Sequence, residues 1–142
     1  EAGIRASAAF VDRLVEREIA RGIAAGRILL AGFSQGGAIV LTAGLRQSNA
    51  LGGIIALSTY LPLAWALEAE AAPANRKTPI FMAHGAMDPV IPMPRALASR
   101  DALTARGYAV EWHAYPMPHS VCTEEIRDLA NWMQARFSPA AE

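Results

Sequence analysis

Apolar and polar positions follow two different spacings along the chain, and the spacing changes at stretches rich in glycine or proline. From Ile4 to Ala24 apolar residues recur every three or four positions with charged residues between them. This pattern predicts an amphipathic helix that ends near Gly22 or Gly26. Residues 28–33 are apolar without that spacing, which is typical of a short strand covered on both faces. The sequence therefore predicts a helix followed by a buried strand.

The same change of spacing repeats along the rest of the chain. Helical spacing recurs in four further segments, at 38–45, 63–70, 94–106 and 123–137. Short apolar runs predict three further strands, at 53–58, 79–85 and 109–115. Polar residues interrupt the last strand, which favours an edge or half-exposed place, and Thr123 is expected to be the N-cap of the last helix. Alternating helices and strands predict an α/β fold: about four parallel strands with flanking helices, in one domain.

Composition and charge narrow the possible functions. The chain has 142 residues, 53% of them hydrophobic, and its 13 basic residues balance 13 acidic ones, so nothing favours a nucleic-acid partner. Cys122 is the one cysteine, which leaves no disulfide within the chain and no thiolate metal cluster. The sequence shows no apolar run long enough to span a bilayer and no charged-then-apolar segment of the kind expected for a signal peptide. We therefore expect a cytoplasmic protein without stable membrane insertion.

One serine stands between glycines where the first predicted strand gives way to a helix. Residues 32–36 read Gly-Phe-Ser-Gln-Gly and match the G-x-S-x-G pattern of a nucleophile elbow. In such a turn Ser34 has a strained backbone, and the small residues at 32 and 36 let strand and helix approach closely. The backbone N–H of Gln35 then faces the developing oxyanion. The pattern alone is weak, because a glycine-rich turn at a helix N-terminus also binds phosphate.

An acid and a histidine follow two later strands in the chain order that a triad on this fold requires. Asp88 comes just after the strand at 79–85, and His119 comes just after the strand at 109–115. Because the carboxyl ends of parallel strands share one edge of the sheet, Ser34, Asp88 and His119 are expected to meet there. Each also has a simpler interpretation: Ser34 as a turn residue, Asp88 as a turn former, and His119 as a loop residue before the last helix.

The remaining histidines, tryptophans and the cysteine are interpreted as structural. His84 is expected to support the end of its strand, and His113 to face solvent. Cys122 is expected to be a small hydrophobic residue beside the last helix. Trp112 and Trp132 fit core packing better than ligand stacking.

Four segments together resemble a known family. They read GFSQGGA at 32–38, LSTYLP at 57–62, HGAMDPVIP at 84–92 and YPMPHSVCTEEI at 115–126. The chain resembles the bacterial carboxylesterase branch of the phospholipase/carboxylesterase family, which includes acyl-protein thioesterases and lysophospholipases. The resemblance implies an α/β-hydrolase fold, the triad Ser34, Asp88 and His119, and no cofactor. It also implies that Tyr60, Leu61 and Val90 line the acyl channel.

The resemblance does not extend to the N-terminal part of the family's domain. Relatives carry preceding strands and a His-Gly-Leu-Gly-like loop that supplies a second oxyanion donor, and residues 1–26 do not resemble that part. We therefore expect the chain to be the C-terminal portion of a hydrolase domain, with an unpaired strand edge at residues 28–33. Such an edge could pair two copies of the chain into a homodimer.

The resulting function hypothesis is a serine hydrolase that cleaves small carboxylic esters of short to medium acyl chains through an acyl-enzyme. The alternative within the same chemistry is a lysophospholipase or an acyl-protein thioesterase, and chain-length preference separates these. Two further alternatives stay open: an inactive fragment that carries triad residues, and a non-catalytic α/β module whose turn at 34–37 holds a phosphate.

Overall fold

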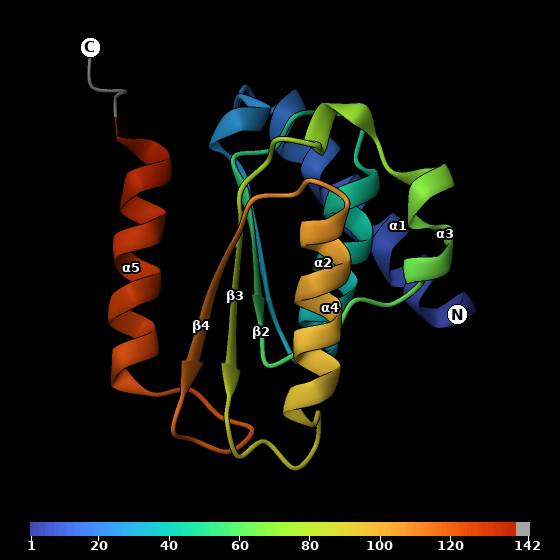
Figure 1. Cartoon of the computed structure of the whole chain (residues 1–142). Helices are drawn as coiled ribbons and strands as arrows, with labels where there is room; N and C mark the ends of the chain where they lie inside the picture. The colour runs from blue at the N-terminus through green and yellow to red at the C-terminus, as the bar shows by residue number, and fades with distance from the viewer. Residues whose placement is uncertain (139–142) are drawn as a thin grey trace.

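Four parallel strands form one sheet in the order β1-β2-β3-β4 in the computed structural model, which describes residues 1–138. The strands are β1 (Leu29–Phe33), β2 (Gly53–Leu57), β3 (Ile80–Gly85) and β4 (Val110–Tyr115). Each strand pairs with its sequence neighbour, with Gly32 opposite Ala56 and Met82 opposite Trp112. All four carboxyl ends therefore lie at the same edge of the sheet, where loops follow them (Figure 1).

Helices cover both faces of the sheet (Figure 1). They are α1 (Ala2–Ala20), η1 (Ala25–Arg27), α2 (Gln35–Arg46), α3 (Ala64–Glu70), η2 (Pro73–Asn75), α4 (Met93–Ala105) and α5 (Thr123–Phe137). α5 stands alone on one face, and α1, α2 and α4 lie on the other. The predicted α/β layering with a parallel four-stranded sheet is confirmed.

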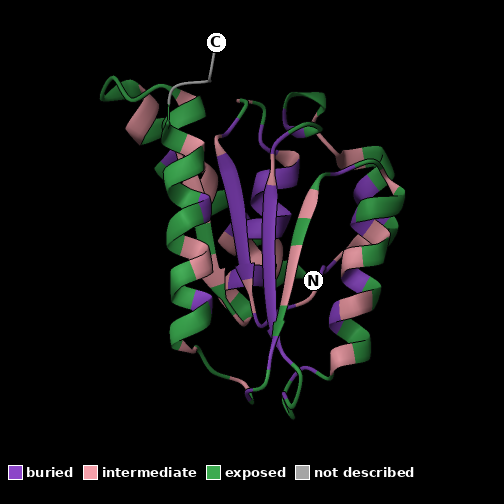
Figure 2. Ribbon diagram, turned by 60° about the vertical axis from the view of Figure 1, so that its left-hand side comes forward, coloured by how far each residue is buried: buried purple, intermediate pink, exposed green. Residues whose placement is uncertain are grey.

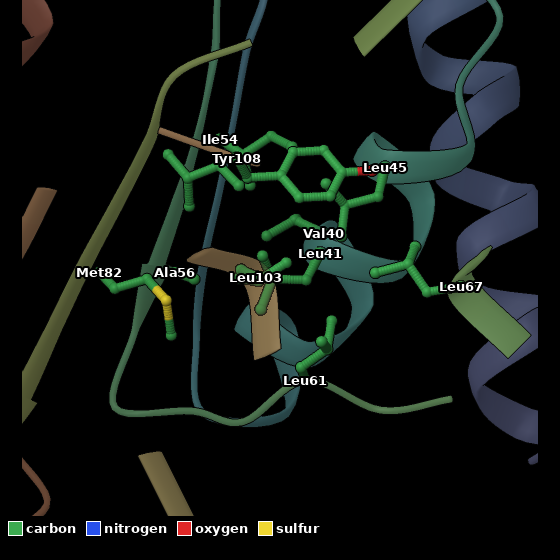
Figure 3. Packing of buried hydrophobic residues seen from close by; sticks show 11 residues of the cluster. Val40, Leu41, Leu45, Ile54, Ala56, Leu61, Leu67, Met82, Leu103 and Tyr108 are labelled. Carbon is green, nitrogen blue, oxygen red and sulfur yellow. The ribbon is translucent and has the colours of Figure 1, made fainter. Parts of the chain in front are cut away.

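Alternate residues of β2 and β3 divide the core between the two faces. Ile54, Ala56 and Met82 pack with residues of α2, α3 and α4 (Figure 3). Ile55 and Phe81 point to the opposite face and pack against Trp132 of α5. Both central strands are buried along most of their length (Figure 2), so their carboxyl ends are held rigidly.

The outer strands are less buried than the central ones. β4 mixes partly buried and exposed residues, as the polar residues in its sequence predict. β1 was expected to be covered on both faces, but Ala31 is exposed and Phe33 keeps 40% of its surface exposed. That expectation is wrong for the described residues, because β1 is an edge strand that pairs only with β2.

Helix ends agree with the predictions to within a few residues, with one error. α1 ends at Ala20, and Gly22 follows with φ 101°, the left-handed conformation that glycine adopts after a helix. The N-cap of α5 is Cys122 and not Thr123, because the Cys122 carbonyl accepts the first helical bond, from the N–H of Ile126. Cys122 has no side-chain capping bond, so side-chain preference misplaced this boundary by one residue.

Candidate active site

Ser34 occupies a sharp turn between β1 and α2. Its φ of 57° and ψ of −120° lie in a region that non-glycine residues rarely adopt, as the elbow pattern predicts. The Ser34 N–H donates to the carbonyl of Leu57 at 2.8 Å, and the Ser34 carbonyl accepts from Ala38 as the first bond of α2. Because the helix begins at the next residue, the N–H groups of its first turn have no partner within the helix.

Close approach of strand and helix depends on Gly32 and Gly37. A Cβ on Gly32 would collide with the backbone of Gly36, so no larger side chain fits there. A Cβ on Gly36 itself would meet open space, whereas one on Gly37 would lie 2.6 Å from the methyl group of Thr59. The expected need for a small residue is therefore confirmed at position 32 and wrong at position 36, where the crowding falls on Gly37 instead.

The loops that carry Asp88 and His119 are bonded to each other at the ends of β3 and β4. The N–H of Ala86 donates to Tyr115 at 2.8 Å, and the N–H of Met87 donates to Met117 at 3.1 Å. A Cβ on Gly85 would collide with the backbone carbonyls of Met117 and Pro118, so only glycine lets the loops meet. These bonds fix the two side chains relative to one another.

Ser34, His119 and Asp88 form a continuous chain of hydrogen bonds, although 85 and 31 residues separate its successive members. His119 Nε2 lies 3.0 Å from Ser34 Oγ. His119 Nδ1 lies 2.7 Å from Asp88 Oδ2. The Asp88 side chain is fully buried, while the His119 side chain remains 18% exposed. A hydroxyl next to an imidazole that is itself oriented by a carboxylate is the arrangement that activates an oxygen nucleophile.

Asp88 is held in its ionised form. Burial alone would raise its pKa, but hydrogen bonds from the Ile91 N–H, His119 and the Val90 N–H outweigh burial and hold the pKa below its usual value. Asp88 Oδ1 accepts from Val90 and Ile91 at 2.8 and 2.9 Å, which leaves Oδ2 for His119. The two oxygens thus have separate tasks: one closes the loop and the other orients the imidazole.

Two neighbours of these three residues contact them in ways that sequence reasoning did not predict. His84 is buried, with Nε2 at 2.8 Å from the Ile91 carbonyl and 3.6 Å from Asp88 Oδ2, so it supports the acid loop as well as the strand end. The four-residue spacing from His84 to Asp88 was the available signal. The Phe33 ring packs against the His119 imidazole with centroids 4.9 Å apart. Phe33 therefore limits how far the imidazole can move.

Of the three residues that the resemblance places along an acyl channel, two line one cavity and the third does not. Tyr60 and Leu61 line a cavity of about 450 Å³ between the β2–α3 loop, α1 and α4, and the lining includes none of the three hydrogen-bonded residues above. Arg95 lies over the Tyr60 ring at 3.8 Å. Val90 does not line this cavity, and its side chain is exposed.

The other chemistry-bearing residues have structural surroundings. His113 stacks on Phe81 and is bonded to Glu111 at 2.8 Å, so it is less solvent-facing than expected. Trp132 is buried in the core, and Cys122 packs partly buried against the same cluster. Within residues 1–138, no three His, Cys, Asp or Glu side chains are grouped to hold a metal, and no helix is long and apolar enough to cross a membrane.

Comparison with known proteins agrees with the geometry. The sequence model described as phospholipase/carboxylesterase matches residues 1–136. The chain belongs to the phospholipase/carboxylesterase family. Within this family it is 44% identical to acyl-protein thioesterase 1 of Neurospora crassa, over all of the chain and 59% of that protein. It is 32% identical to a probable carboxylesterase of Oryza sativa subsp. japonica, over all of the chain and 54% of that protein.

Solved structures of similar proteins have the same fold. Arabidopsis thaliana SOBER1 superimposes with a TM-score of 0.93 at 28% identity, covering 97% of the chain and 66% of SOBER1. Zea mays acyl-protein thioesterase 2 superimposes with a TM-score of 0.80 at 28% identity, covering 96% of the chain and 66% of that structure. The predicted α/β-hydrolase fold and family resemblance are confirmed, and the chain spans about three fifths of the curated relatives it matches.

Proposed function

We propose that the protein is a serine hydrolase that cleaves carboxylic esters through a covalent acyl-enzyme, with Ser34 as nucleophile. The observation that carries this proposal is the hydrogen-bonded chain from Ser34 Oγ to His119 to Asp88, at 3.0 and 2.7 Å, on a turn with positive φ at the serine. Membership of a family of esterase-type hydrolases supports the reaction class.

In the proposed mechanism each group has one task. His119 Nε2 accepts the Ser34 proton while Oγ attacks the carbonyl carbon, and then delivers that proton to the leaving group. Asp88 holds the imidazole in the tautomer with a proton on Nδ1 and stabilises the imidazolium. The Gln35 N–H, at the N-terminus of α2, donates to the oxyanion of the tetrahedral intermediate. Water then attacks the acyl-enzyme by the reverse sequence and releases the acid.

For the substrate, we propose small carboxylic esters of short to medium acyl chains, with acyl thioesters of proteins as the second candidate. The thioester candidate is favoured by the relatives named acyl-protein thioesterase 1. Values of kcat/KM across a series of ester and thioester substrates of increasing chain length separate the two. Each methylene accommodated in an apolar pocket changes the preference by about 1–3 kcal/mol.

We also propose that residues 1–142 are part of one hydrolase domain whose sheet continues beyond the free edge of β1 in the whole protein. The exposed face of β1 and the partial span of the relatives support this. A second oxyanion donor would then come from outside these residues. The activity of the whole protein is expected to exceed that of the isolated chain, because losing one oxyanion donor costs about 10²–10³ in turnover.

The test is covalent labelling of the purified chain with a fluorophosphonate, followed by peptide mapping. Activated Ser34 is expected to carry the label, and His119→Ala is expected to abolish it. His113→Ala is the matched control, because that histidine contacts neither Ser34 nor Asp88 in the hydrogen-bonded chain. A folded chain that stays unlabelled, or that labels equally in both variants, contradicts the proposal. Anion binding at the turn that does not depend on His119 would favour a phosphate-binding module.

A further inference from the structure

The strained backbone of Ser34 is held on both sides by the end of β2. Its N–H donates to the Leu57 carbonyl at 2.8 Å. Its carbonyl accepts a bond of 2.6 Å from the Thr59 hydroxyl, in addition to the helical bond from Ala38. Thr59 is 1% exposed, so its hydroxyl is shielded from solvent. Strained residues persist only where their surroundings over-determine them, and here residues 57 and 59 supply that restraint.

The chain between those two contacts is itself in an unusual conformation. Ser58 has φ 51°, and its N–H donates to Ala83 of β3 at 2.8 Å. The methyl group of Thr59 fills the space over Gly37, where an added Cβ would lie 2.6 Å away. The Thr59 side chain is thus fixed by its methyl group against α2, which aims its hydroxyl at the Ser34 carbonyl.

We propose that Thr59 is a positioning residue that fixes and polarises the Ser34–Gln35 peptide unit. The carbonyl that Thr59 contacts and the Gln35 N–H belong to the same planar peptide group, so holding one end sets the direction of the other. A hydrogen bond to the carbonyl oxygen also draws electron density from the N–H and makes it a stronger donor. Nothing in the G-x-S-x-G pattern indicates this contact, because Thr59 lies 25 residues away.

The proposal concerns the oxyanion donor and therefore rests on the proposed function for its kinetic consequence. Charge on the oxyanion is largest in the transition state, so weakening the Gln35 N–H lowers kcat and leaves KM unchanged. The loss is expected to be about ten-fold, which is less than the 10²–10³ that removal of a whole oxyanion donor costs. The geometry of the Ser34–Gln35 peptide unit can also be followed without any activity measurement, through the 15N chemical shift of Gln35.

The experiment compares three substitutions in the isotope-labelled 142-residue chain. Thr59→Val removes the hydroxyl and keeps the methyl group, Thr59→Ala removes both without crowding the carbonyl, and Thr59→Ser keeps the hydroxyl. Thr42→Val is the matched control, since it removes another buried threonine bond to a backbone carbonyl in α2, that of Thr42 to Ala38 at 2.8 Å. For each variant the Gln35 15N shift, the rate of fluorophosphonate labelling, and kcat and KM for a p-nitrophenyl ester are measured.

The expected result is a moved Gln35 shift and labelling about ten-fold slower in the Val and Ala variants, with Ser34 labelling near normal in Thr59→Ser and Thr42→Val. An unmoved Gln35 shift in folded Val and Ala variants overturns the proposal, as does labelling at the unsubstituted rate. If the unsubstituted chain is not labelled but the Gln35 shift moves, the positioning role of Thr59 stands and the proposed function of this chain fails. The two failures are therefore distinguishable.

Discussion

At the scale of single residues, the turn at Ser34 depends on the absence of a Cβ at Gly32. Gly32 faces the backbone of Gly36, which cannot move aside as a flexible side chain could. Gly32→Ala is expected to lower the free energy of unfolding by about 3 kcal/mol, because overpacking against backbone strains the β1–α2 turn. Thermal or urea unfolding measures this loss.

Gly36→Ala provides the matched control for that substitution. A Cβ at position 36 meets no atom within 4 Å, and alanine is the better helix former. The control is expected to raise the unfolding free energy by about 0.5 kcal/mol. Equal destabilisation by both substitutions would contradict the steric argument.

Glu125 predicts how stability depends on pH. The residue is completely buried in the first turn of α5, and neither carboxylate oxygen has a hydrogen-bond partner among the described residues. Burial raises the pKa of Glu125 to about 6 from 4.5. The pKa of Glu125 is higher in the folded chain than in the unfolded chain. The contribution of the protonated Glu125 side chain to the free energy of unfolding is therefore complete below pH 4.5 and is lost as pH rises through 6.

The measurement compares the unfolding free energy of the chain and of Glu125→Gln from pH 4 to pH 7. The difference between the two is expected to fall by about 2 kcal/mol over this range, since one pKa unit corresponds to about 1.4 kcal/mol. Asp88, whose pKa is lowered, acts in the opposite direction in both proteins and so cancels in the difference. Parallel curves for the two proteins would contradict the prediction.

At the scale of elements, Asn75 joins the end of α2, the start of β2 and the approach to β3. It is fully buried, and its amide group makes four hydrogen bonds of 2.6–2.9 Å, to Gln47, Asn49, Leu51 and Thr78. Asn75→Ala is expected to cost about 3 kcal/mol of unfolding free energy, because it leaves backbone groups of these loops buried and unpaired. Urea unfolding measures the cost.

Asn131→Ala is the control for this substitution, because Asn131 is an exposed residue of α5. It is expected to change the unfolding free energy by less than about 0.5 kcal/mol. If Asn75→Ala changed the unfolding free energy as little as Asn131→Ala, packing alone and not the Asn75 amide would hold the segments that it joins.

At the scale of the whole molecule, the free edge of β1 predicts self-association. Ser34 donates to Leu57 and Ile28 accepts from Gly52, so alternate residues face β2 and Ala31 directs its N–H and carbonyl away from it. Exposed strand edges pair with other chains. The chain is expected to form a concentration-dependent dimer in sedimentation experiments.

A charge on this edge is expected to prevent that pairing. Ala31→Lys should shift the chain towards the monomer, because a lysine at an edge opposes strand pairing. Ala20→Lys introduces the same charge at an exposed position of α1 and should leave the dimer intact. A chain that sediments as a monomer at every concentration would contradict both expectations.

Local pattern alone predicted much of this molecule. Apolar spacing depends on which face of a helix or strand is buried, so it identified the helices and strands from residues a few positions apart. The alternation of helices and strands then predicted that the strands run parallel. The elbow at Ser34, and the positions of Asp88 and His119 after later strands, follow from the same logic, because parallel strands bring their carboxyl ends to one edge.

Contacts between distant segments could only be decided by the tertiary structure. The exposure of β1 depends on which strands pair with it, and the N-cap at Cys122 depends on where the loop from β4 delivers the chain. The support of Asp88 by His84 and of Ser34 by Thr59 depends on contacts of 3.6 and 2.6 Å, which the packing of separate loops sets. The spacing of His84 and Asp88 could suggest only that the two are neighbours, and nothing in the sequence suggests the contact of Thr59 with Ser34, because close packing of the folded chain sets both distances.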